Sequence, residues 1–193
     1  MPYGVARRAM IARSILVVGG ARSGKSAYAE GLARASGLAR VYLATGSAGD
    51  GEMAERIALH RAQRGPDWAC VEEPLALVAA LTREARAERV ALVDCATFWL
   101  ANLMFAGRDV AAETAALVAA LPQIAGPVLI VANEVGQGIV PDNALARRFR
   151  DAHGRLNQAL AAACDAVIEV RLGIPLQLKP APAPDVRFFG RPR

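Results

Sequence analysis

Residues Ile15–Ser26, ILVVGGARSGKS, are the stretch from which the fold of this chain is predicted. Four aliphatic residues lead directly into GGARSGKS, which fills every fixed position of the pattern G-x-x-x-x-G-K-[ST], the phosphate-binding loop. Glycines allow backbone angles and close approaches that a Cβ would block. The backbone N–H groups of the loop, together with the N-terminus of the following helix, can then bind an anion. The helix-forming run 27–35 supplies the required context. The stretch therefore predicts a nucleoside triphosphate site rather than a chance glycine-rich turn.

Three side chains are expected to serve the phosphates and a Mg²⁺ ion. Lys25 is predicted to reach the β- and γ-phosphates, and the Ser26 hydroxyl to ligate the metal. The apolar run 89–94, RVALVD, ends in Asp94, the pattern that supplies a second carboxylate for Mg²⁺, commonly through a water. A strand-terminal aspartate can also cap the next helix. The upstream lysine and serine favour the metal role.

Composition limits the class of protein. The 193 residues predict one domain, and no apolar stretch approaches the ~20 residues of a membrane span, so no membrane anchor is expected. The three cysteines, Cys70, Cys95 and Cys164, lie too far apart in the sequence for a metal-binding motif. Their odd number argues against a disulfide framework. The cysteines therefore predict a cytoplasmic protein with reduced, mostly buried thiols. The net charge of +5 is spread thinly as arginines, which favours anionic small molecules over nucleic acid.

Strand and helix patterns alternate along the chain. After the first strand they predict strands at 41–45, 68–72, 89–94, 127–132 and 166–170, with an edge strand within 172–179. Helices are predicted after the phosphate loop and at 52–64, 74–86, 97–121 (in two pieces) and 142–164. This alternation predicts an α/β fold: a single RecA-like P-loop NTPase domain with a mainly parallel sheet covered on both faces.

The predicted topology also locates a site. The domain is expected to span 15–179, between a flexible leader, 1–14, and a proline-rich basic tail, 180–193. Right-handed crossovers place the loops after four strands along one rim, so the phosphate loop, Thr45, Asp94 and the pair Asn133-Glu134 should converge.

Other residues leave alternatives open at this stage. Glu134 is a candidate for Mg²⁺ or substrate-hydroxyl positioning, or a loop carboxylate that holds backbone amides. His60 shares a helical face with Met53 and Ile57, which by spacing alone favours a packing residue. His153 is expected at the surface or an interface. A strip on the last long helix, including Leu145, Phe149 and Leu156, is a candidate for subunit packing.

Several separated stretches together resemble one known family. They are GGARSGKS, YLATG at 42–46, EMAERIALHRAQR at 52–64, VDCATFWLANL at 93–103, NEVGQGIVP at 133–141 and FRDAHGRLNQALAAACD at 149–165. The phosphate loop is shared by very many proteins, whereas NEVGxGIVP with the FRD helix is far more specific. On these motifs the chain resembles the bifunctional adenosylcobinamide kinase / adenosylcobinamide-phosphate guanylyltransferase family of cobalamin biosynthesis, over about Ile15–Lys179.

The resemblance implies two reactions. The first moves the γ-phosphoryl group of ATP or GTP onto the aminopropanol hydroxyl of adenosylcobinamide. The second transfers GMP from GTP to adenosylcobinamide phosphate through a GMP-histidine intermediate, and releases pyrophosphate. The family's histidine matches His60. A neutral imidazole is nucleophilic near neutral pH, and Arg56, Arg61 and Arg64 could offset the charge on departing pyrophosphate.

The resemblance also assigns nucleotide contacts and a homo-oligomer, a trimer. Among these contacts Glu72 is the weakest on chemistry alone, because surface glutamates are common, but its carboxylate can accept hydrogen bonds from guanine or ribose, which would favour GTP. By position the family's contacts fall on Gly19, Gly20, Ala21, Arg22, Ser23, Gly24, Lys25 and Ser26, on Ala44, Thr45 and Gly46, on Arg61, Ala62, Gln63 and Arg64, and on Glu72 and Asp94. Three alternatives stay open: a single-activity kinase for another small metabolite without a covalent nucleotide, a nucleotide-gated regulatory protein, and a family member that has lost its kinase half.

Overall fold

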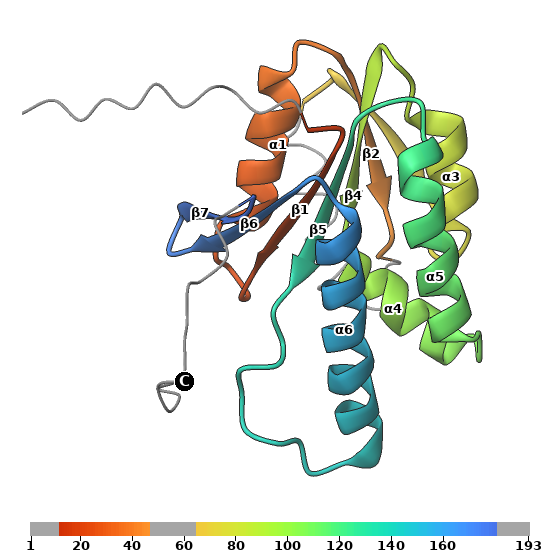
Figure 1. The fold of residues 1–193 in the computed structure, drawn as a ribbon, viewed down its shortest axis with the longest axis vertical. Coiled ribbons are helices and arrows are strands. Elements are labelled where there is room, and N and C mark those ends of the chain that lie inside the picture. Colours follow the sequence, from red (N-terminus) through yellow and green to blue (C-terminus); the bar gives the residue numbers. More distant parts are fainter. Residues whose placement is uncertain (1–11, 47–64, 181–193) are drawn as a thin grey trace, which may run out of the picture.

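The computed structural model describes residues 12–46 and 65–180, which form one seven-stranded sheet flanked by helices (Figure 1). The sheet has the order β3-β2-β4-β5-β1-β6-β7. Its strands are β1 Ser14–Gly19, β2 Ala39–Ala44, β3 Trp68–Glu72, β4 Arg89–Asp94, β5 Val128–Asn133, β6 Ala166–Arg171 and β7 Ile174–Lys179. The helices are α1 Lys25–Ala35, α3 Leu77–Glu84, α4 Ala96–Phe105, α5 Val110–Ala120 and α6 Ala144–Ala163, with a 3₁₀ turn at Leu121–Gln123.

Six strands are parallel and the last edge strand, β7, pairs antiparallel with β6. The predicted mainly parallel α/β sheet is therefore confirmed. The register places Gly19 opposite Asn133 and Ala44 opposite both Glu72 and Asp94. The carboxyl ends of β1 to β5 consequently lie along one rim, as the alternating pattern predicts.

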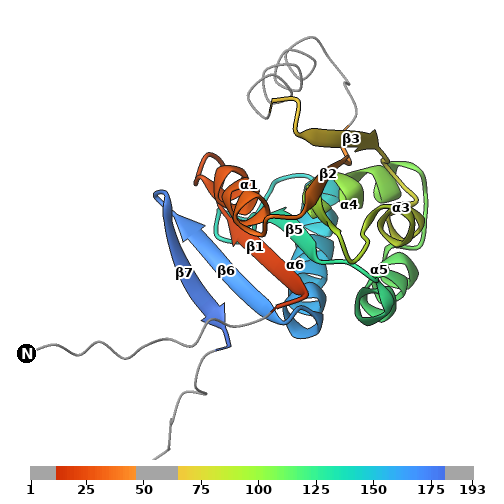
Figure 2. The same ribbon diagram turned by 90° about the horizontal axis from the view of Figure 1, so that it is seen from above.

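Helices cover both faces of the sheet (Figure 2). α1 packs on one face through Ala29 and Ala33, against strand residues that include Val17 and Leu92. α3, α4, α5 and α6 cover the other face, in a larger core that includes the fully buried Trp99. Each central strand therefore contributes alternate side chains to two cores, which is why those strands read as continuous apolar runs.

The structure corrects the predicted start of one helix. The helix expected from residue 74 begins three residues later, at Leu77, because the Glu73 carboxylate accepts hydrogen bonds from the backbone N–H groups of Leu75 (3.0 Å) and Ala76 (2.7 Å). This turn takes the place of a first helical turn. The predicted break in 97–121 is confirmed, with Asp109 capping α5 through two backbone N–H groups. The predicted helix 52–64 lies outside the described residues.

The structure contradicts the expected position of His153 and removes Leu156 from the predicted packing strip of α6. His153 is fully buried rather than at the surface, and its ring lies 5.7 Å from that of Phe149. Leu156 belongs to the core as well, so of the predicted packing strip only Leu145, which is 53% exposed, presents a large apolar surface. The face of α6 that carries His153 and Leu156 points into the protein because α4 and α5 pack against this helix.

The remaining general features concern membranes and thiols. No helix within residues 12–46 and 65–180 is both long enough and apolar enough to cross a membrane. Cys95 and Cys164 are buried, and Cys70 is exposed; none of the three forms a disulfide bond among the described residues.

Candidate active site

The phosphate-binding loop joins β1 to α1 and is closely packed at its start. A Cβ on Gly19 would overlap the carbonyl oxygen of Val170 on β6 and would lie 2.6 Å from Ser23 Oγ. Gly24 is the N-cap of α1 and has φ +94°, in the left-handed region that glycine adopts without strain. Both glycines of the motif are thus required by geometry, and the loop holds its backbone close to the helix start.

The beginning of α1 has the properties of an anion site. Its first turn contains no acidic residue, and its N-cap offers no side-chain hydrogen bond. Lys25 Nζ donates a hydrogen bond to the Gly20 carbonyl oxygen at 3.1 Å, which folds the ammonium group back over the loop. Ser26 follows in the first helical turn. Backbone N–H groups, a helix N-terminus and a nearby ammonium group together match the charge of a polyphosphate.

The turn between β6 and β7 supports the loop, a contact that sequence reasoning missed. The backbone N–H of Gly173 donates to the Ser23 carbonyl oxygen at 2.9 Å, and a Cβ on Gly24 would lie 3.3 Å from Gly173 Cα. Leu172 and Gly173 both have positive φ, as a tight hairpin turn requires. Ser23 and Gly173 are 150 residues apart in the sequence, and no local motif predicts a contact over that separation. Gly173 itself is the one sequence signal, because a glycine indicates a tight turn.

Thr45, one of the predicted nucleotide contacts, is fully buried between the ends of β2 and β4. Its hydroxyl accepts a hydrogen bond from the Cys95 backbone N–H (2.8 Å) and donates one to the Cys95 carbonyl oxygen (2.7 Å). The Thr45 carbonyl oxygen accepts from Asn102 Nδ2 at 2.7 Å. The side chain therefore joins two strand ends, which leaves Ala44 and Gly46 as the partly exposed members of this group.

Asp94 lies half-buried at the end of β4 and does not cap the next helix, because the N-cap of α4 is Cys95 and makes no side-chain cap bond. Of the two roles left open for Asp94, capping is therefore contradicted. The Ser26 hydroxyl and the Asp94 carboxylate are hard oxygen donors, the type that Mg²⁺ prefers. Within the described ranges no group of three or more metal-ligating side chains occurs. One or two protein ligands fit Mg²⁺, since the ion keeps waters and binds substrate phosphates.

Two other carboxylates lie on the same rim at different distances from the loop. Glu134 directly follows β5, beside β1, and its Oε1 accepts from the Gly136 backbone N–H at 2.8 Å. This is the loop-carboxylate role that the sequence leaves open. Glu72 is exposed at the end of β3, four strands from β1. At about 4.8 Å per strand the two strand ends are roughly 19 Å apart.

His60 and the segment Arg61, Ala62, Gln63 and Arg64 lie outside the described residues. Their predicted roles stay predictions.

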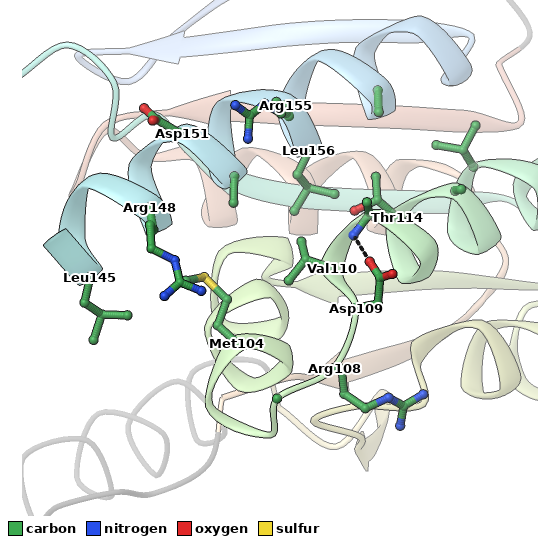
Figure 3. A pocket seen from close by; sticks show the side chains of 16 residues that line it. Met104, Arg108, Asp109, Val110, Thr114, Leu145, Arg148, Asp151, Arg155 and Leu156 are labelled. Carbon is green, nitrogen blue, oxygen red and sulfur yellow. Dashed lines mark hydrogen bonds between the residues drawn. The ribbon is translucent and has the colours of Figure 1, made fainter.

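A wide groove between α5 and α6 was not predicted by any motif (Figure 3). It has a volume of about 1000 Å³ and combines apolar walls with the arginines Arg108, Arg148 and Arg155. Leu145 and Leu156 of α6 stand on one side of it, and Met104, Val110 and Thr114 on the other. It is separate from the residues predicted to bind nucleotide.

The sheet order, the phosphate-binding loop after β1 and the acidic end of β4 define a P-loop nucleotide-binding protein. A family model described as cobinamide kinase / cobinamide phosphate guanyltransferase matches residues 15–178. The chain belongs to this family, as its motifs predict.

Curated relatives match over almost their whole length. The chain is 49% identical over 169 residues to the bifunctional adenosylcobalamin biosynthesis protein CobP of Pseudomonas aeruginosa, covering 86% of this chain and 98% of the relative. It is 41% identical over 180 residues to the bifunctional protein CobU of Escherichia coli, covering 86% and 99%. Among solved structures, a type III secretion ATPase is similar with a TM-score of 0.49 and 12% identity, over 81% of this chain and 50% of that one.

Proposed function

We propose that this protein phosphorylates adenosylcobinamide and then transfers GMP to the product. In the first reaction the substrate hydroxyl attacks the γ-phosphorus of ATP or GTP, and the nucleoside diphosphate leaves. The observation that carries the proposal is the preformed loop of Gly19 to Ser26, in a chain that belongs to this family. Lys25 and the amides at the start of α1 would neutralise charge on the transferred phosphoryl group.

The second reaction is assigned to His60. An imidazole nitrogen of His60 attacks the α-phosphorus of GTP, and the bond to pyrophosphate breaks. A phosphate oxygen of adenosylcobinamide phosphate then attacks the same phosphorus, which frees the imidazole and forms adenosyl-GDP-cobinamide. The motif EMAERIALHRAQR supports this assignment, and Arg56, Arg61 and Arg64 would offset the charge on departing pyrophosphate.

The nucleotide is proposed to lie along the rim. Phosphates would sit on the loop from Gly19 to Ser26, near Ala44, Thr45 and Gly46, with Arg61, Ala62, Gln63 and Arg64 also in contact. Glu72 would accept hydrogen bonds from guanine or ribose. Because β3 and β1 are four strands apart, a nucleotide that reaches from the phosphate-binding loop to Glu72 would have to be extended. Mg²⁺, held by Ser26 and Asp94, would supply charge neutralisation at the phosphates.

The proposal extends to the oligomeric state, the cellular compartment and the partners of the protein. We infer a homo-oligomer, a trimer, acting in the cytoplasm, without nucleic acid as a partner. The family membership and the thinly spread charge support this description.

Product analysis with separate variants tests the two-step proposal. Wild type is incubated with adenosylcobinamide, ATP, GTP and Mg²⁺, and the corrinoid products are followed by mass. Lys25→Ala is expected to lower phosphorylation by about 100-fold or more. His60→Ala should instead accumulate adenosylcobinamide phosphate, because it retains the first reaction. A His60→Ala enzyme that still forms adenosyl-GDP-cobinamide, or a wild type that forms neither product, would contradict the proposal.

A further inference from the structure

The end of β5 lies directly beside the phosphate-binding loop. Asn133, the last residue of β5, is the register partner of Gly19, and the next backbone N–H, that of Glu134, donates to the Gly19 carbonyl oxygen at 3.0 Å. The position of the first loop residue therefore depends on where the Asn133–Glu134 backbone is held.

On its other side Asn133 lies beyond the last paired residue of the neighbouring strand, β4. The pairing of β4 with β5 ends at Asp94 opposite Val131, where the chain of β4 turns into α4. Side chains from two helices take over there: the Asn133 N–H donates to Thr97 Oγ1 at 2.8 Å, and Asn157 Nδ2 donates to the Asn133 carbonyl oxygen at 3.0 Å. Both backbone polar groups of one residue are thus bound by side chains.

His153 completes the arrangement from α6. Its Nε2 lies 2.9 Å from Thr97 Oγ1, within hydrogen-bond distance, and its ring is fully buried. His153 and Asn157 are four residues apart, on one face of the helix. Burial lowers the pKa of His153, although Glu134 opposes this shift. A buried polar side chain is costly unless its hydrogen bonds are used; here Nε2 has Thr97 within reach, whereas Nδ1 is buried without a hydrogen-bond partner among the described residues.

We propose that Thr97, His153 and Asn157 are positioning residues for the transfer reactions, because they hold the Asn133–Glu134 backbone that fixes Gly19. None of the three needs to touch the substrate. Their effect runs through the carbonyl of Gly19 to the loop that would orient the polyphosphate. The consequence for catalysis rests on the proposed function, whereas the consequence for the backbone does not.

Matched variants of the full-length enzyme test the catalytic consequence. Thr97→Val keeps the shape but loses the hydroxyl, and Thr97→Ser keeps the hydroxyl. His153→Leu removes the polar ring, whereas His153→Gln can place either an amide N–H or an amide oxygen near Thr97. We expect Thr97→Val and His153→Leu to lower kcat by about 10-fold, with the nucleotide KM changed less than about threefold. Thr97→Ser and His153→Gln should recover most of kcat.

Hydrogen exchange tests the backbone consequence without any corrinoid substrate. With GTP as the probe, Thr97→Val and His153→Leu should exchange faster than wild type at 133–138, and GTP should protect 19–26 less. Either a fall in thermal stability with unchanged kcat and exchange, or equal kcat in Val and Ser variants, would overturn the proposal. If wild type performs neither transfer but the exchange differences appear, the proposed function fails and the positioning of the loop stands.

Discussion

The backbone N–H of Glu134 donates a hydrogen bond to the carbonyl oxygen of Gly19 at 3.0 Å. This bond joins the end of β5 to the first residue of the phosphate-binding loop. On the opposite side, the Gly173 N–H donates to the Ser23 carbonyl oxygen at 2.9 Å. The loop is therefore held from β5 and from the β6–β7 turn before any phosphate arrives, which lowers the ordering cost of binding.

Replacement of Gly19 should be far more harmful than replacement of its neighbour. A Cβ on Gly19 would overlap the Val170 carbonyl oxygen, which is backbone and cannot rotate away, whereas a Cβ on Gly20 meets nothing within 4 Å. We expect Gly19→Ala to lower stability by about 1–3 kcal/mol and to weaken GTP binding. Thermal unfolding and nucleotide titration of both variants measure this difference. Equal unfolding temperatures for Gly19→Ala and Gly20→Ala would show that the close approach is absent.

The Thr45 hydroxyl should contribute to stability rather than only to nucleotide contact. Thr45→Val keeps the side-chain shape but leaves the buried Cys95 N–H without the hydroxyl it donates to, whereas the Cys95 carbonyl oxygen still accepts from the Trp99 backbone N–H at 3.1 Å. We expect a loss of about 1–3 kcal/mol in urea unfolding. Thr45→Ser keeps the hydroxyl and serves as the control, with a smaller loss. A Thr45→Val protein as stable as the serine variant would contradict this role.

Asp165 should make the stability depend on acid pH. Its Oδ2 accepts hydrogen bonds from the backbone N–H groups of Ser14 (3.0 Å) and Arg13 (2.8 Å), and these bonds lower the pKa of the carboxyl below 3.8. A lowered folded-state pKa stabilises the fold above the unfolded value, and the contribution is lost as pH falls through the folded value. Asp165→Ala should therefore unfold at a lower temperature than wild type at pH 7. The difference should shrink below pH 3.8, and a gap independent of pH would argue against this explanation.

The three cysteines should differ in reactivity. Burial raises the pKa of Cys95 to about 11 and that of Cys164 to about 12, whereas Cys70 is exposed on β3. Because the thiolate is the reactive form, iodoacetamide should modify Cys70 in the native protein and all three thiols after unfolding. Mass analysis of the alkylated peptides checks the pattern. Rapid labelling of Cys95 or Cys164 in the native protein would contradict this pattern. It would mean that the end of β4 (for Cys95) or the end of α6 (for Cys164) unfolds locally.

Much of the fold is predictable from local pattern. Strands β3 and β4 have the predicted bounds, and a turn precedes each of them. Asp109 caps α5 as expected, since an aspartate just before a helix-forming run is a local helix signal. The buried site of His153 could not be predicted, because it depends on Thr97 of α4, which is 56 residues away in the sequence.

The candidate site likewise has one part that is predictable from local sequence and another that depends on tertiary packing. The loop of Gly19 to Ser26 follows from a contiguous motif. The support given to the loop by Gly173, and the binding of Asn133 by Thr97 and Asn157, come from tertiary packing alone. Thr45 illustrates a further difficulty: its position on the rim is predictable, but the partner of its hydroxyl, Cys95, is not.

The covalent GMP-histidine intermediate is the central claim, and its direct detection is the decisive measurement. Wild type and His60→Ala are incubated with Mg²⁺ and GTP labelled at the α-phosphate, then examined by denaturing gel and intact mass. Digestion with trypsin under alkaline conditions, which preserve a phosphoramidate, separates His60 in residues 57–61 from His153 in residues 151–155. We expect an acid-labile GMP adduct on 57–61 in wild type and none in His60→Ala. No adduct in wild type, or an adduct that persists in His60→Ala, would contradict the account.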